Sequence, residues 1–364
     1  MSRFAHLLST GSLGALHIPN RVLMAPMTRG RARADGTVTS VAALHFSQRA
    51  SAGLLLTDAV AVAPEAMASV GTPGLWSDAQ AESWRAVVKR VHVAGGRIAL
   101  QLMHAGRLAL PANQCDGGRT VSSSAVRAER RVPASVEPAA EPRALAIGEI
   151  AGIVAQFAGG ARRGIEVGFD AIEIHACNGC LLDQFLRDGV NQRHDRYGGS
   201  ADNRARLLLQ VVEAVARECG ADRTGVRLSP LDRGNDMHDD DPLDTFGTAL
   251  RHLASLQLAW THLAHMPDGD VTRRLRDMHG RPFVLNGGFS AESADAVIRD
   301  ELASAVSFGR LYVANPDLVE RFEHGAELAD SDPATWVGGD ARGYTDHPSL
   351  LRDQDARDPL PRLP

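Results

Sequence analysis

Eight short apolar runs, separated by longer stretches of helical or irregular spacing, constrain the fold of this 364-residue chain more than any other feature. The runs are Val22–Ala25, Gly53–Ala59, Arg97–Met103, Asp170–Ala176, Thr224–Pro230, Leu258–Ala264, Pro282–Gly288 and Ala305–Gly309. The stretches with helical spacing include Ala81–Ala94, Ile147–Gly168, Ser200–Cys219, Asp244–Leu256, Thr272–His279 and Ala291–Leu302. Runs that are apolar on both faces suit parallel strands buried beneath helices. The alternation therefore predicts a (β/α)8 barrel of the TIM-barrel class rather than a doubly wound sheet.

The whole chain is expected to form one domain, with three additions to the barrel. Residues 1–20 precede the first strand and predict a β-hairpin, with Thr10 and Gly11 as its turn. Residues 107–143 follow the third strand and predict a long irregular loop, and loops of this length are usually functional or mobile. Residues 338–364 are rich in Asp, Arg and Pro and predict a surface tail.

Composition excludes several classes of protein. The net charge is −5, and Lys89 is the only lysine among 39 scattered basic residues, so nucleic acid is not an expected partner. No apolar run approaches the roughly 18–20 residues of a membrane span, so a membrane is not an expected partner either. Four cysteines in so long a chain do not make a disulfide scaffold, which favours a cytoplasmic protein.

Polar side chains and glycines gather where the predicted strands end, and barrels of this class carry their chemistry at those carboxyl ends. They are Thr28, Ala59, Gln101 with His104, His175 with Asn178, Arg227, Gly287 with Gly288, and Gly309 with Arg310. Glycines beside an arginine suit a phosphate, which backbone N–H groups and a guanidinium bind together. No cluster of Asp, Glu and His has metal-ligand spacing, so no metal is expected. The pattern predicts a phosphorylated planar cofactor that faces His175 and Asn178.

Longer motifs extend over nearly the whole chain. They read NRVLMAPMTR at 20–29, QRASAG at 48–53, QLMHAGR at 101–107, GFDAIEIHACNG at 168–179, LDQFLR at 182–187 and RYGGS at 196–200. RLSP at 227–230, NDM at 235–237, FGR at 308–310, ANPDL at 314–318 and GYTD at 343–346 follow. In content and order these motifs resemble the Old Yellow Enzyme family of flavin-dependent ene-reductases.

The resemblance implies non-covalent FMN as the cofactor. The residues that it places around the flavin ring are Ala25, Pro26, Met27, Thr28, Ala59, Gln101 and Arg227, and those at the phosphate are Gly287, Gly288, Gly309 and Arg310. Arg227 would lie near N1 and the C2 carbonyl, where its fixed charge would stabilise the anionic reduced flavin.

The resemblance also implies an activity. NADPH or NADH would reduce the flavin, which would then reduce the C=C bond of a small α,β-unsaturated carbonyl compound or related activated alkene. His175 and Asn178 would donate hydrogen bonds to the carbonyl oxygen, where negative charge develops in the transition state.

Four positions depart from the family pattern. Cys180 stands where the family has a tyrosine that protonates the α-carbon. A thiol of pKa about 8.5 is a stronger acid than a phenol, so Cys180 is a candidate catalytic residue, with water as the alternative proton donor. Ser69, Met103 and Val337, which follows Trp336, stand where aromatic residues are common. Together with Trp336 they are expected to line a wide pocket for a bulky substrate.

Other functions are compatible with these motifs. Loss of the tyrosine keeps open a redox-neutral isomerase or a desaturase that uses the same flavin. A flavin-binding protein with little turnover is a third class, against which the retained His175 and Asn178 argue. Cys177 and Cys180 form a C-x-x-C pattern, but no second cysteine pair supports a metal or a redox disulfide. The assembly is expected to be a monomer or a homodimer.

Overall fold

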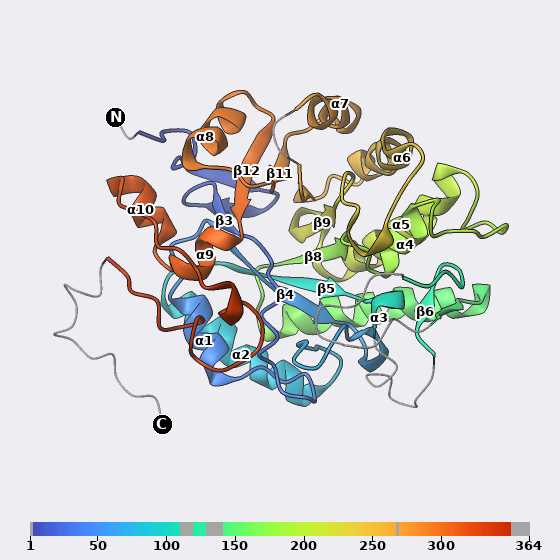
Figure 1. Cartoon of the computed structure of the whole chain (residues 1–364), viewed down its shortest axis with the longest axis horizontal. Coiled ribbons are helices and arrows are strands. Elements are labelled where there is room, and N and C mark those ends of the chain that lie inside the picture. The colour runs from blue at the N-terminus through green and yellow to red at the C-terminus, as the bar shows by residue number, and fades with distance from the viewer. Residues whose placement is uncertain (1–2, 110–118, 129–140, 267–268, 351–364) are drawn as a thin grey trace.

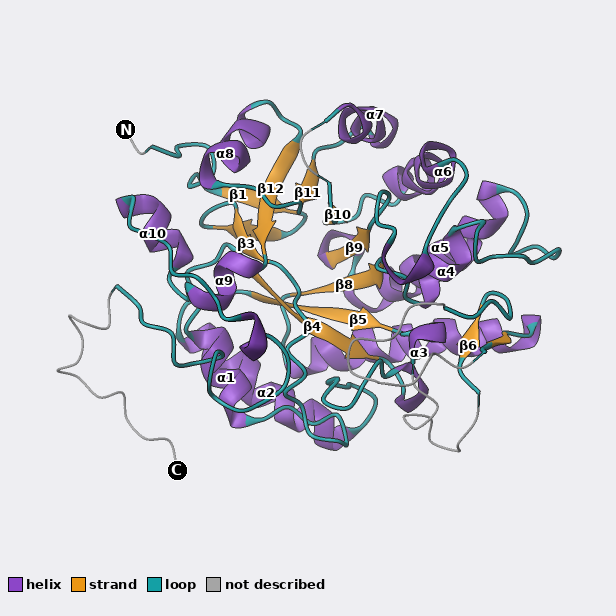
Figure 2. Cartoon of the chain, in the orientation of Figure 1, coloured by secondary structure: helices purple, strands orange, loops and turns teal. Residues whose placement is uncertain are grey.

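A closed barrel of eight parallel strands forms the centre of the protein (Figures 1 and 2). The computed structural model describes residues 3–109, 119–128, 141–266 and 269–350. The barrel strands are β3 (Val22–Met24), β4 (Leu54–Ala61), β5 (Ile98–Met103), β8 (Ala171–Ala176), β9 (Thr224–Leu228), β10 (Trp260–Leu263), β11 (Phe283–Leu285) and β12 (Ala303–Phe308). They neighbour one another in chain order, and β12 closes the barrel on β3. The predicted (β/α)8 fold is confirmed.

Helices surround the barrel, as Figure 2 shows in purple. The helices are α1 (Ser40–Ser47), α2 (Asp78–Val93), α3 (Ile147–Val167), α4 (Leu181–Leu186), α5 (Ala201–Cys219), α6 (Pro242–Ser255), α7 (Asp270–His279), α8 (Ala291–Arg299), α9 (Arg310–Ala314) and α10 (Leu318–His324). The sequence pattern predicts six of them, to within a few residues at either end. It misses α1, α4, α9 and α10, because helices of so few turns carry too little periodicity to be recognised.

The strands are buried on both faces. Every residue of β5 and β8 is buried, since the outward side chains pack under the helices and the inward ones fill the barrel. Leu23, Leu54 and Ala99 belong to the inner apolar cluster, and so do Leu13 and Ile18 of the N-terminal hairpin. The hairpin therefore covers the amino-terminal end of the barrel, which leaves the carboxyl ends as its open mouth.

The hairpin is present, but its turn lies later than the sequence suggests. Its strands are β1 (Gly11–Leu13) and β2 (Leu16–Ile18), so Gly14 and Ala15 form the turn and Thr10–Gly11 does not. Gly14 has a φ of +56°, and a Cβ there would lie 2.1 Å from the carbonyl oxygen of Asp222. Only glycine fits this position, because the turn packs directly against the loop before β9.

The excursion after β5 and the C-terminal segment have ordered parts. The excursion contributes the short parallel pair β6 (Val121–Ser122) and β7 (Arg143–Ala144), while its residues 110–118 and 129–140 lie outside the described residues. The C-terminal segment is not entirely on the surface, because Tyr344 is buried. Its ring stacks on His45 of α1 with 3.8 Å between centroids, and the guanidinium of Arg31 lies 4.4 Å from the same ring. The buried ring of Tyr344 therefore holds part of the C-terminal segment against α1, although the composition of this segment predicts an exposed tail.

Within the described ranges, no helix combines the length and the apolar character needed to cross a membrane.

Candidate active site

Strand register brings the predicted polar residues together at the mouth of the barrel. Between β8 and β9, His175 is the register partner of Arg227, and between β5 and β8, Gln101 is the partner of Glu173. His262 of β10 is the partner of Arg227 on its other side. Side chains from four consecutive strands therefore meet in one polar layer that is two register rows deep, with Gln101 and Glu173 in the lower row.

A buried carboxylate, Glu173, organises this layer. Its Oε1 accepts a hydrogen bond from Gln101 Nε2 at 2.7 Å. Its Oε2 accepts from Trp260 Nε1 at 2.7 Å and from His262 Nδ1 at 2.9 Å. The other nitrogen of His262 lies 2.9 Å from Ser307 Oγ of β12, so the network reaches across the barrel.

The charges in this layer are set by burial and by neighbours. Burial raises the pKa of Glu173, but the charge and hydrogen bond of His262 and the charge of Arg227 outweigh it and lower this pKa to about 2. Burial and the positive charge of Arg227 lower the pKa of His262. At neutral pH an ionised carboxylate therefore lies beneath the mouth of the barrel, beside a neutral imidazole.

His175 lies at the end of β8 and is a neutral hydrogen-bonding group. Burial and the positive charge of Arg227 lower the pKa of His175 to about 3. Its Nδ1 lies 3.1 Å from Gln101 Oε1, and because the amide oxygen only accepts, the imidazole donates there. Cys177 Sγ lies 3.6 Å from the same ring nitrogen. Glu173 thus fixes the Gln101 amide, and that amide fixes the tautomer of His175.

Asn178 lies two residues beyond β8 and faces the loops after β9 and β10. Its backbone N–H donates to Ser229 Oγ at 2.9 Å, and its carbonyl oxygen accepts from Asn235 Nδ2 at 2.9 Å. Its amide nitrogen lies 3.1 Å from Asp232 Oδ2 and 2.9 Å from His265 Nε2. Asn178 therefore lies at the mouth, as predicted, with its amide held by two acceptors.

Arg227 and the predicted phosphate residues offer donors with spare capacity. Arg227 as a whole residue is 6% exposed; its Nη2 lies 3.3 Å from Asn286 Oδ1, whereas its buried Nε has no hydrogen-bond partner. Gly288 has a φ of +79°, and a Cβ there would meet nothing within 4 Å. Gly309 precedes α9, whose first residue, Arg310, is exposed. Open space beside glycines and an unused buried N–H fit a ligand with acceptor groups.

The segment after β3, residues 25–28, adjoins the predicted phosphate residues. Ala25 is buried, Pro26 and Met27 are half-buried, and Thr28 is exposed. Met27 Sδ lies 3.7 Å from where a Cβ on Gly309 would stand, so this segment adjoins the start of α9. The two parts of the predicted cofactor site, distant in sequence, are neighbours in the fold.

Cys180 lies in an apolar part of the site. It clusters with Met103, Leu108 and Ala128, and Ala59 packs against the same cluster. Burial, with the nearby charge of Asp183, raises the pKa of Cys180 to about 12. The expectation that this thiol is a stronger acid than a phenol is therefore wrong here, because the apolar surroundings disfavour the thiolate.

The remaining predicted pocket residues, Ser69, Trp336 and Val337, lie outside this apolar cluster. The carbonyl oxygen of Trp336 accepts from Arg29 Nε at 2.8 Å, which ties the C-terminal segment to the segment after β3. Val337 is 59% exposed and lies beside Gly30. Ser69 is half-buried, and its N–H donates to Thr72 Oγ1 at 3.1 Å.

Sequence reasoning missed the polar floor of the site and two residues of its rim. These residues are Glu173, Trp260, His262 and Ser307 in the floor, and Asp232 and His265 at the rim. A charged residue in the middle of an apolar run, as at Glu173, was the available signal for the floor. The rim residues follow strands without any pattern that marks them.

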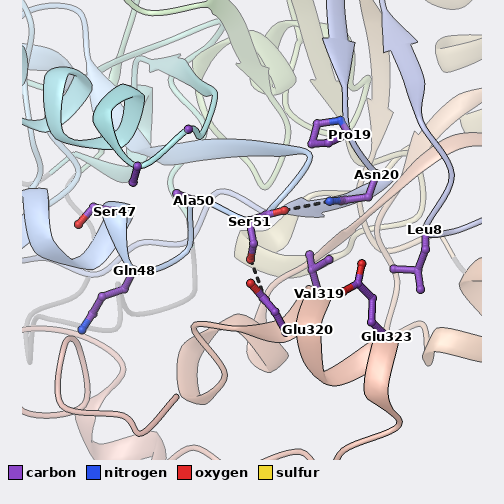
Figure 3. A pocket seen from close by; sticks show the side chains of 12 residues that line it. Leu8, Pro19, Asn20, Ser47, Gln48, Ala50, Ser51, Val319, Glu320 and Glu323 are labelled. Atoms are coloured by element: carbon purple, nitrogen blue, oxygen red, sulfur yellow. Dashed lines mark hydrogen bonds between the residues drawn. The ribbon is translucent and has the colours of Figure 1, made fainter. Parts of the chain in front are cut away.

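A cavity of about 510 Å³ lies at the opposite end of the barrel (Figure 3). Asn20, Ser51 and Gly95, which precede β3, β4 and β5, line it, together with Glu320 and Glu323 of α10. None of the predicted site residues lines this cavity, and Figure 3 shows that Ser51 already binds Glu320. It is therefore separate from the site at the carboxyl ends.

A closed parallel barrel with polar and cationic groups at the carboxyl ends of its strands is typical of (β/α)8-barrel enzymes. A family model described as "NADH:flavin oxidoreductase / NADH oxidase family" matches residues 11–329. The chain belongs to this flavin oxidoreductase family, in its Old Yellow Enzyme group, which confirms the resemblance seen in the sequence.

Named relatives and solved structures agree with this assignment. The chain is 38% identical over 370 residues to putative 12-oxophytodienoate reductase 12 of Oryza sativa subsp. japonica, covering 96% of this chain and 90% of the relative. It is 35% identical over 372 residues to flavin oxidoreductase hxnT of Emericella nidulans, with 92% and 95% covered. Morphinone reductase in complex with tetrahydroNAD superposes with a TM-score of 0.91 at 41% identity, over 97% of this chain and 99% of that one. The Old Yellow Enzyme homologue from Zymomonas mobilis gives a TM-score of 0.91 at 37% identity, with 94% and 99% covered. These likenesses favour an FMN-dependent reductase over the isomerase or desaturase alternative.

Proposed function

We propose that this protein uses NADPH or NADH to reduce the C=C bond of small activated alkenes, such as α,β-unsaturated carbonyl compounds, with FMN as its cofactor. The observation that carries the proposal is the meeting of His175, Asn178, Gln101 and Arg227 at one mouth of the barrel. His175 lies 3.1 Å from Gln101 and is the register partner of Arg227, two of the residues proposed to bind the flavin.

The residues present fit FMN. The buried, unpartnered Nε of Arg227 can donate to a ring acceptor, and the amide of Gln101 can serve the pyrimidine edge. Ala25, Pro26, Met27, Thr28 and Ala59 would lie along the ring, and Gly287, Gly288, Gly309 and Arg310 would hold the phosphate. When bound, FMN supplies the hydride that adds to the β-carbon of the alkene.

His175 and Asn178 are proposed to bind the substrate's carbonyl oxygen. Asn178 carries two amide hydrogens, and the depressed pKa of His175 keeps its ring neutral, with its one N–H on Nδ1 facing Gln101 Oε1. The substrate oxygen would replace the Gln101 amide oxygen as the partner of that N–H. Hydrogen bonds to this oxygen withdraw electrons from the β-carbon and strengthen as negative charge develops. In such sites, loss of one donor costs ~100–1,000-fold in rate.

The proton for the α-carbon is proposed to come from water. The Cys180 thiol, with its pKa raised to about 12 and its apolar surroundings, is a poor donor. Cys180 packs with Met103 and would shape the pocket with it, and Ser69, Trp336 and Val337 are proposed to border it. With no aromatic residue at three of these positions, we propose that the pocket accepts bulky alkenes.

We also propose a cytoplasmic location. Cys177, Cys180 and Cys219 are free thiols within the described part of the chain, as is usual in reducing compartments.

An anaerobic flavin titration tests the function. The purified protein with FMN is treated with NADH or NADPH, and then with 2-cyclohexenone, while the flavin absorbance is followed. Bleaching by a nicotinamide and recovery with the enone are expected. A protein that takes up no FMN, or a bleached flavin that no enone reoxidises, would refute the proposal.

A further inference from the structure

The backbone of Asn178 is fixed from two sides. Its φ of +56° is in the left-handed region, which asparagine tolerates better than most residues. Its N–H and its carbonyl oxygen are both bonded to residues of the loop after β9, Ser229 and Asn235. Only rotation of the side chain can therefore re-aim its amide.

Both hydrogens of that amide are already engaged. The nitrogen Nδ2 has two hydrogens, and two acceptors lie within reach: Asp232 Oδ2 at 3.1 Å and His265 Nε2 at 2.9 Å. The amide oxygen in turn accepts from Cys177 Sγ at 3.0 Å. A substrate oxygen that binds Asn178 must therefore displace one of these two acceptors.

The two acceptors differ in how easily they can be displaced. Asp232 is a carboxylate whose second oxygen accepts from the N–H of Gly234 at 2.9 Å, so its loop holds it in place. A hydrogen bond to a carboxylate is also about twice as strong as one to a neutral acceptor. His265 is exposed, lies two residues beyond β10, and stands at the open rim of the barrel. It is the acceptor that a substrate oxygen can replace.

We propose that His265 competes with the substrate's carbonyl oxygen for one amide hydrogen of Asn178, and so determines how tightly the enzyme binds its substrate. This inference rests on the proposed function, since it takes Asn178 as a donor to that oxygen. His265 is a positioning residue here: it holds the donor before substrate binds and releases it to the substrate oxygen.

Two substitutions separate the acceptor from the bulk of the side chain. His265→Leu fills similar space without an acceptor, whereas His265→Gln offers an amide oxygen to the same hydrogen. The dissociation constant of 2-cyclohexenone is measured by calorimetry on the oxidised FMN-bound protein, and kcat and KM are measured alongside. His265→Leu is expected to lower the dissociation constant and KM about 3- to 10-fold, the range of one neutral hydrogen bond, while His265→Gln stays near wild type.

A double-mutant cycle gives the decisive control. In an Asn178→Ala background there is no amide for which to compete, so His265→Leu should no longer tighten enone binding. The inference is overturned if His265→Leu binds the enone no tighter than wild type, if His265→Gln behaves as His265→Leu, or if the tightening persists without Asn178. Failure of the proposed function looks different, because wild-type protein would then neither bind the enone nor have its reduced flavin reoxidised by it.

Discussion

Glu173 is the residue whose replacement tests the architecture of the site most directly. Its carboxylate accepts hydrogen bonds from three buried N–H donors, on Gln101, Trp260 and His262, at 2.7–2.9 Å. Glu173→Leu removes all of these acceptors at once and leaves the charge of Arg227 without its nearby counter-charge. Glu173→Gln keeps one acceptor oxygen in nearly the same space.

The expected loss of stability follows from the number of donors left without a partner. A buried unsatisfied donor costs ~1–3 kcal/mol, and breaking a buried ionic arrangement by removing one partner costs ~3–5 kcal/mol. Because Gln101 can turn its amide to recover part of this, we expect Glu173→Leu to lower the free energy of unfolding by about 3–5 kcal/mol. Glu173→Gln should cost about 1–3 kcal/mol, since a single donor then lacks an acceptor.

Urea denaturation followed by circular dichroism measures these losses. Running it without FMN and with saturating FMN separates the stability of the fold from weakened cofactor binding. Glu292→Gln is the matched control, because its ion pair with Arg3 is more than half exposed and should contribute ~0–1 kcal/mol. A loss below about 1 kcal/mol for Glu173→Leu, equal to that of the control, would show that the polar floor does not stabilise the barrel.

Four further outcomes are expected. His175→Ala should lower enone turnover ~100–1,000-fold while the protein keeps its flavin, measured by kcat and by the FMN content; unchanged turnover would exclude His175 as a donor. Cys180→Ala should leave alkene reduction within about twofold at pH 7, because a thiol of pKa about 12 is not the acid; a large loss of kcat would contradict this. Gly225→Ala should destabilise the fold by ~1–3 kcal/mol or more in thermal denaturation, since its Cβ would lie 2.1 Å from the ring of Trp260; an unchanged melting temperature would refute this close approach. Because the pKa of Glu173 falls from its ordinary 4.5 to about 2 in the fold, its contribution is complete above pH 4.5 and is lost as the pH falls towards 2, so Glu173→Gln should show a smaller acid-induced loss than wild type.

The sequence predicted the fold well because a barrel of buried parallel strands leaves a strong pattern. Each strand must be apolar on both faces, and each returning helix must be amphipathic, so the eight runs could be read directly. Residues near the carboxyl ends of strands were then placed at one mouth by topology alone, as for His175, Arg227 and Gln101.

The features that the sequence did not predict correctly depend on contacts between segments that are distant in the chain. The turn at Gly14 is decided by the loop that carries Asp222, and burial of Tyr344 is decided by His45 and Arg31. Likewise, the acidity of Cys180 depends on apolar neighbours that come from strand β5 and the excursion after it. In each of these cases the local sequence predicted a different result, because it carries no information on which distant segments come into contact.

The hydrogen bonds of the site link the proposed cofactor residues to the proposed substrate residues. Gln101 donates to Glu173 with its amide nitrogen and accepts from His175 with its amide oxygen, so this amide has one orientation that satisfies both neighbours. Any group that recruits Gln101 must therefore alter the partner of His175, and replacing Glu173 frees the same amide to turn over. Binding at the cofactor site and hydrogen bonding to a substrate oxygen are then coupled through one side chain rather than independent. The buried position of Glu173, in the middle of β8 and one register row below His175, thus accounts for why a charged residue interrupts an otherwise apolar run.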